Sequence, residues 1–176
     1  TTAFVLTQRN GACQRIVGSE NESLKKELLP DLCSGKTFAT VGISHLTTSR
    51  QHLARPAVSV EMKGETAIFS GTIPWVTGAD HAKYIVTGGT CADGKQVLAV
   101  IETSLAGVTV NEPPLLLSMN ASRTGSVDLQ GVAVEKSWII AGPIEHVMKQ
   151  GVGGKTGSLT TSALAAGTTA GVLQRL

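Results

Sequence analysis

The sequence predicts an α+β fold in which an antiparallel β-sandwich or β-barrel lies between helical segments. Apolar residues recur at helical spacing within residues 1–36, and short runs of alternating apolar and polar residues fill residues 37–143. From residue 144 onward the sequence is again helical in character, rich in Ala, Leu and Thr. We therefore divide the chain into helical residues 1–36, a β-domain of residues 37–143 and a second helical part, residues 144–176.

The first helical part contains start and stop signals. Ser19 followed by Glu22 matches a capping box, and Gly35 stands where a glycine would end the helix. The apolar positions between them repeat at helical spacing: Leu24, Leu28, Leu29 and Leu32. Pro30 predicts an irregular last turn. An earlier helix is expected to be broken or bent near Asn10-Gly11.

Two hairpins are predicted in the β-domain, with turns at Lys63-Gly64 and Asp93-Gly94. The strands that they join are residues 57–62 and 66–70 in the first hairpin, and 84–87 and 96–101 in the second. Further strands are expected in residues 38–43, 108–110 and 125–134. Short, closely spaced strands are typical of a sandwich or barrel.

Residues 158–176 predict a helix that is apolar all round, with almost no charge before Arg175. Such a helix is normally buried among other helices. The sequence holds no such partners and does not begin with Met, so we expect this chain to be a piece of a longer protein.

Composition excludes several classes of protein. Charged residues are 16% and hydrophobic residues 41%, which excludes a disordered chain. A net charge of +2 and six aromatic residues argue against nucleic acid or an anionic membrane as the main partner, and no apolar run is long enough to span a bilayer. Cys13, Cys33 and Cys91 are interpreted as small, buried apolar residues in a reducing compartment.

Motifs for metal binding and nucleophilic catalysis are weak. The four histidines lack metal-ligand spacing, and Asp80-His81, adjacent on an expected strand, should point apart. No Gly-x-Ser-x-Gly occurs. Residues 151–156 superficially resemble a phosphate-binding loop but lack its spacing, so we interpret them as a connector before a helix.

The most informative stretch is residues 70–82, where a strand ends in Trp75-Val76-Thr77 before a turn at Gly78. Five other segments follow the same order as motifs of one family: residues 24–36, 63–65, 82–86, 105–110 and 122–134. Together they resemble the acyl-CoA dehydrogenase family, whose middle domain carries Trp-Ile-Thr-Asn at this strand end. The resemblance covers the end of an N-terminal helical domain, the middle β-domain and the start of a C-terminal helical domain, both helical domains being incomplete here.

The resemblance implies that FAD is the cofactor and indicates which residues of this chain would contact it. Ser44 would take the place of a threonine that binds the pyrimidine end of the isoalloxazine, Trp75 would pack beside that ring, and Thr77 would face flavin N5. The contacts expected by the same comparison are Ile43, Ser44, Ser49, Arg50, Trp75, Val76 and Thr77, with Ser49 and Arg50 near the phosphates. Residues 43–50 depart from the family pattern, since its Pro, Ala-Gly and Asp are all absent.

The implied reaction is α,β-dehydrogenation of an acyl-CoA thioester, with hydride passing to FAD. The family's base is a carboxylate of the C-terminal domain, so no catalytic residue is assigned here and the fragment alone should not turn over. The resemblance also implies a homodimer or homotetramer, an electron acceptor such as an electron-transfer flavoprotein, and a cytoplasmic or mitochondrial-matrix location. Two alternatives stay open: a degenerate member that binds an acyl-thioester or a partner without redox activity, and a flavin-dependent monooxygenase on the same fold.

Overall fold

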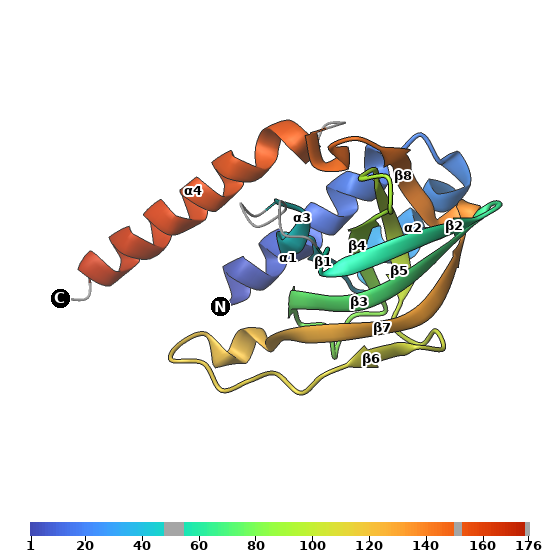
Figure 1. The fold of residues 1–176 in the computed structure, drawn as a ribbon. Helices are drawn as coiled ribbons and strands as arrows, with labels where there is room; N and C mark the ends of the chain where they lie inside the picture. The colour runs from blue at the N-terminus through green and yellow to red at the C-terminus, as the bar shows by residue number, and fades with distance from the viewer. Residues whose placement is uncertain (48–54, 150–152, 175–176) are drawn as a thin grey trace.

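The structure is a computed structural model that describes residues 1–47, 55–149 and 153–174 (Figure 1). Helices α1 (Thr2–Val17) and α2 (Glu22–Cys33) precede the strands, and α4 (Gly153–Leu173) follows them. The short helices between are α3 (Ser44–Thr47), η2 (Asn120–Ser122), η3 (Lys136–Trp138) and η4 (Val147–Lys149).

Eight strands form one sheet in the order β6-β7-β3-β2-β4-β5-β8, with β1 paired to β4. The strands are β1 (Ala39–Gly42), β2 (Val58–Lys63), β3 (Thr66–Thr77), β4 (Tyr84–Thr90), β5 (Gln96–Glu102), β6 (Val108–Val110), β7 (Thr124–Glu135) and β8 (Ile139–Ile144). Most neighbours are antiparallel, as predicted, but β4 pairs in parallel with β1 and, at one position, with β2. The α+β class is confirmed.

The sheet curls so that its two halves face each other, with β3 and β7 in front of β4 and β5 in Figure 1. One apolar cluster fills the space between the halves and includes Phe69 of β3, Ile85 of β4, Ala99 of β5 and Val132 of β7. Within the described residues the order ends at β6 and β8, so the sheet resembles a sandwich folded from one sheet rather than a closed barrel.

A second apolar cluster lies between the outer face of the sheet and helices α1 and α2. Tyr84 and Val86 of β4 contribute to it, whereas Ile85 between them points into the first cluster. Because successive side chains of a strand alternate between faces, β4 and β5 are buried on both sides. These two strands therefore lie between the two apolar clusters at the centre of the fold.

Both predicted hairpins are present. Lys63 pairs with Thr66 across a turn in which Gly64 has φ +62°, and Gly94 has φ +84° between β4 and β5. Glycine adopts such conformations without steric cost. Strand β8 was not predicted, because Gly142-Pro143 interrupts the apolar pattern and Pro argues against a strand interior.

The N-terminal helices differ from the prediction in two details. Asn21, not Ser19, caps α2, because its Oδ1 accepts the Leu24 N–H at 3.1 Å, while the Ser19 hydroxyl donates to the Ile140 carbonyl. Helix α1 is one unbroken helix through Gly11, so the break expected there is absent. Gly35, with φ +75°, follows the end of α2 as predicted.

Three further expectations are corrected. Asp80 and His81 lie in a turn rather than a strand, with His81 Nε2 3.8 Å from Asp80 Oδ2. Cys33 is exposed, whereas Cys13 and Cys91 are half-buried. Helix α4 begins at Gly153, so residues 153–156 belong to the helix and not to a connector.

Helix α4 contacts α1 and η4 near its start and then projects away from the sheet (Figure 1). The side chains of residues 165–174 are exposed, including Val172 and Leu173. In the described part of the chain, no helix combines the length and the apolarity needed to cross a membrane.

Candidate functional site

The two sequence segments expected to bind a cofactor meet at one end of the sheet. Strand β1 runs directly into α3, which lies against β3. The hydroxyl of Thr40 donates to the Thr77 carbonyl at 2.8 Å, and a Cβ on Gly42 would lie 2.7 Å from a methyl group of Ile73. Ile43 and Ser44 are thereby held beside the end of β3 that carries Trp75 and Thr77.

A β-bulge directs the side chains at the end of β3. Ile73 pairs with Val127 of β7 but Val76 pairs with Gly125, so β3 has one extra residue between these positions. Val76 consequently points into the first apolar cluster, and Trp75 and Thr77 share the opposite face. Trp75 is 53% exposed on that face, which leaves its ring available to a ligand. Any contact from Val76 to a ligand there would come from its backbone.

Thr77 is nearly buried, at 4% exposure, and pairs directly with Thr124 of β7. Their hydroxyl oxygens are 3.0 Å apart, and the Thr124 hydroxyl also lies 2.8 Å from that of Ser122. The resemblance assigned Thr77 a role but none to Thr124 or Ser122. The strand register brings Thr77 to Thr124, and the short helix η2 before β7 places Ser122 against Thr124.

Helix α3 places two unpartnered polar atoms near this end of the sheet. The Oγ of Ser44 and the Nδ1 of His45 are buried and have no hydrogen-bond partner among the residues that the structure describes. The other His45 nitrogen, Nε2, lies 2.8 Å from the Gly88 carbonyl and donates to it. Burial lowers the pKa of His45, an effect that the hydrogen bond to Gly88 partly opposes. His45 was not a predicted site residue.

Arg123 closes the side of the site next to the Gly78 turn. Its carbonyl accepts the Gly78 N–H at 3.0 Å, and its guanidinium pairs with Asp80 and, at 3.5 Å, with Glu112. The hydrogen bond and charge of Asp80 raise the pKa of Arg123. The loop before β7 is thus fastened to the turn that follows β3. Ser49 and Arg50, expected near the cofactor phosphates, lie outside the described residues.

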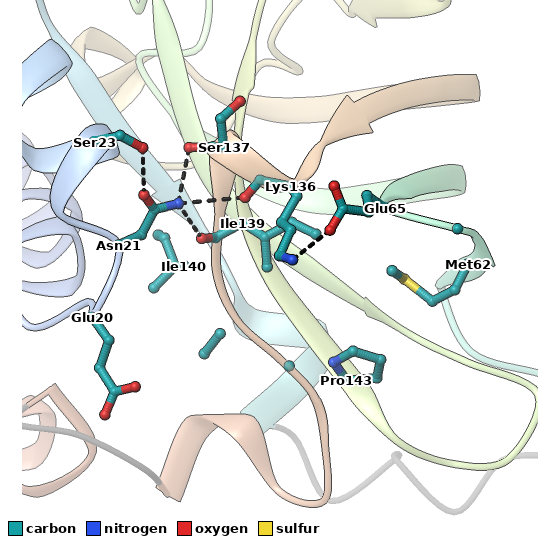
Figure 2. A pocket seen from close by; sticks show the side chains of 13 residues that line it. Glu20, Asn21, Ser23, Met62, Glu65, Lys136, Ser137, Ile139, Ile140 and Pro143 are labelled. Carbon is teal, nitrogen blue, oxygen red and sulfur yellow. Dashed lines mark hydrogen bonds and ion pairs between the residues drawn. The ribbon is translucent and has the colours of Figure 1, made fainter.

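A separate cavity of about 710 Å³ lies at the other end of β3, between the α1–α2 loop, the β2–β3 hairpin and β8 (Figure 2). Several of its polar groups are paired with one another. Asn21 Nδ2 donates to carbonyl groups that include those of Ser137 and Ile139, and Lys136 forms an ion pair with Glu65. These contacts hold the cavity walls together.

No protein-family model matches the sequence, and no curated protein sequence matches it. Solved structures do match. An FAD-dependent dehydrogenase has a TM-score of 0.71 and 23% identity over 82% of this chain and 39% of its own. A glutaryl-coenzyme A dehydrogenase in complex with glutaryl-CoA has a TM-score of 0.65 and 26% sequence identity. That match covers 76% of this chain and 34% of the dehydrogenase.

The chain has the acyl-CoA dehydrogenase fold. It spans between a third and two fifths of the length of these two structures. A dibenzothiophene monooxygenase from Paenibacillus sp. A11-2 has a similar fold, with a TM-score of 0.63 and 18% identity over 76% of this chain and 33% of its own. The acyl-CoA dehydrogenase fold therefore accounts for the sheet and its strand order. Because a monooxygenase has a similar fold, the fold alone does not distinguish a dehydrogenase from a monooxygenase.

Proposed function

We propose that this chain is the central part of an FAD-dependent oxidoreductase that dehydrogenates an acyl-CoA thioester between its α and β carbons. The observation that supports this most directly is the meeting of α3 with the end of β3. There the exposed ring of Trp75, the hydroxyl of Thr77 and the Oγ of Ser44 belong to one end of the sheet, and this Oγ has no partner within residues 1–47, 55–149 and 153–174. A flat aromatic surface beside buried polar atoms suits a heteroaromatic ring that carries hydrogen-bonding edges.

Each residue has a role in this proposal. Trp75 packs beside the isoalloxazine and excludes water, Thr77 presents its hydroxyl near N5, and Ser44 bonds the pyrimidine end. Ile43 and the backbone of Val76 complete the wall, and Ser49 and Arg50 face the phosphates. When bound, FAD supplies the acceptor for two electrons. The substrate's proton is taken by a carboxylate that lies outside this chain.

The domain assignment follows from the same proposal. Residues 1–36 end an N-terminal helical domain, residues 37–143 form the middle domain, and residues 144–176 begin a C-terminal helical domain. The exposed side chains of α4 from residue 165 onward then pack against further helices or a second subunit. We propose a homodimer or homotetramer that passes electrons to an acceptor such as an electron-transfer flavoprotein, in the cytoplasm or mitochondrial matrix.

The test is the amount of FAD that stays bound to each subunit after gel filtration. We expect Thr77→Val to reduce it, since losing a buried hydrogen-bond partner costs about 1–3 kcal/mol. Trp75→Ala should reduce it further by opening the site to water. Thr66→Val, at the far end of β3, is the matched control and should retain FAD. A wild-type protein without FAD, or variants that hold it fully, would show that the assignment is wrong.

A monooxygenase is the second candidate, favoured by the similar fold of the dibenzothiophene monooxygenase. Anaerobic addition of an acyl-CoA distinguishes the two, because a dehydrogenase bleaches its flavin without oxygen and a monooxygenase does not. A degenerate member without redox activity is supported by the altered sequence of residues 43–50. Such a protein would be colourless and would bind an acyl-thioester without turnover.

A further inference from the structure

Three hydroxyl groups form a continuous chain of contacts from the end of η2 to the end of β3. The Oγ of Ser122 lies 2.8 Å from the Oγ1 of Thr124, which lies 3.0 Å from the Oγ1 of Thr77. Ser122 is 2% exposed and Thr77 is 4% exposed, so both ends of this hydroxyl row (Ser122, Thr124 and Thr77) are shielded from water.

The hydroxyl row has one proton more than its internal hydrogen bonds use. Three hydroxyls carry three donor protons, and two contacts use two of them. If Thr124 donates to Thr77, then Ser122 donates to Thr124 and the spare proton is on Thr77. In the reverse arrangement the spare proton is on Ser122, and if both ends donate to Thr124 it is on Thr124. Among the described residues, neither end hydroxyl has a further hydrogen-bond partner, so an outside acceptor can select the arrangement.

The backbone holds the hydroxyl row in place. The Gly78 N–H donates to the Arg123 carbonyl, which makes Gly78 and Arg123 a hydrogen-bonded pair. Because the two kinds of pair alternate along antiparallel strands, Thr77 and Thr124 form a non-hydrogen-bonded pair. In such pairs the strands approach most closely and side chains lie nearest each other. The Ser122 N–H donates to the Met119 carbonyl at 2.8 Å, which fixes the other end. The three oxygens are therefore prearranged before any ligand binds.

We infer that Thr124 and Ser122 are positioning residues that turn the Thr77 hydroxyl into a donor toward the ligand at this site. The inference rests on the proposed function, in which the acceptor is a ring nitrogen of FAD. Ser122 donates to Thr124, Thr124 donates to Thr77, and the Thr77 proton points out of the row. A hydroxyl that accepts one hydrogen bond while donating another is a stronger donor than an isolated one. Thr124 also restricts Thr77 to one side-chain rotamer.

The test measures the dissociation constant of FAD for the purified protein by flavin fluorescence. We expect Thr77→Val to weaken binding roughly tenfold or more, and Thr124→Val to weaken it roughly three- to tenfold. Because Thr124 acts through Thr77, the double variant should bind no more weakly than Thr77→Val alone. Thr124→Ser keeps the hydroxyl and should restore wild-type binding and the wild-type visible spectrum of the flavin, which Thr124→Val should shift.

Thr72→Val is the matched control. Thr72 pairs with Asp128 on the same two strands and donates to its carboxylate at 2.6 Å, but it is exposed and outside the hydroxyl row. Thr72→Val should leave the dissociation constant of FAD and the flavin spectrum unchanged. Circular dichroism should show that every variant is folded. If wild type and Thr124→Val bind FAD equally well, this inference is wrong while the proposed function stands. The same holds if the fold-changes in dissociation constant caused by Thr77→Val and Thr124→Val multiply in the double variant. A wild-type protein that binds no FAD overturns both.

Discussion

The imidazole of His45 donates from Nε2 to the carbonyl of Gly88, over 2.8 Å, and thereby joins α3 to the centre of β4. Its Nδ1 is buried with no partner in the described ranges of the chain, which suits the neutral ring, since no acceptor for a second proton lies there. This contact helps to hold the helix that carries Ser44 against β4, a strand that is buried on both faces.

This contact predicts a loss of stability in mild acid. Burial lowers the pKa of His45 in the folded state from its ordinary value of 6.5. The unfolded chain therefore binds a proton that the folded chain does not, and the free energy of unfolding falls as pH drops below about 6.5. Urea midpoints measured between pH 8 and pH 5 should decrease over this window.

The variant that isolates this effect is His45→Gln, which can keep a donor toward Gly88 but does not titrate. Its midpoint should depend less on pH than that of wild type. His81→Gln, at an exposed turn residue, is the control and should keep the wild-type pH dependence. Equal pH dependence in all three proteins would contradict the role given to His45.

The close approach of β1 to β3 at Gly42 predicts a strong size limit at that position. A Cβ on Gly42 would lie 2.7 Å and 2.9 Å from methyl groups of Ile73 and Val76, inside the distance that real contacts show. Gly42→Ala should destabilise the fold by about 1–3 kcal/mol. Gly167→Ala in exposed helix α4, where nothing lies within 4 Å, should be neutral or stabilising. Thermal unfolding of the two variants gives the comparison.

Asn21 predicts a further stability effect, because its side chain joins α2 to η3 and β8 (Figure 2). Asn21→Ala loses the helix cap as well as the donor to the backbone carbonyls, and should cost about 1–2 kcal/mol. Asn21→Asp keeps the acceptor for Leu24 but turns a carboxylate oxygen toward the carbonyls of Ser137 and Ile139, so it should also be less stable than wild type. Ser23→Ala removes only an exposed hydroxyl that donates to Asn21, and its urea midpoint should stay near that of wild type.

Exposed apolar residues of α4 predict self-association of the protein. Val172 and Leu173 are 55% and 66% exposed near the end of the helix. Light scattering should therefore find a dimer or tetramer, and Val172→Asp combined with Leu173→Asp should lower the assembly state if these side chains lie at the interface. Gln174→Asp, which adds a charge at the neighbouring exposed position, should leave it unchanged. A stable monomer of the wild-type protein would refute the assembly.

Local sequence was sufficient for the α+β class and for the elements whose causes lie within a few residues. The turns at Lys63-Gly64 and Asp93-Gly94 follow from glycine's access to positive φ, and the strands beside them follow from alternating polarity. The end of α2 at Gly35 has the same local origin. The Trp75-Val76-Thr77 strand end was recognised by resemblance to a family motif, and the cofactor roles of these residues remain predictions.

Only the tertiary structure decided the features that depend on distant residues. The choice of Asn21 over Ser19 as helix cap follows from the carbonyl at Ile140, which takes the Ser19 hydroxyl. Strand β8 exists because β5 pairs with it, despite its proline. The contact of Thr77 with Thr124 is set by a strand register that includes a bulge, and no local pattern encodes that register. Hydrogen bonds and packing between segments far apart in the chain, rather than propensity, therefore assemble the candidate site.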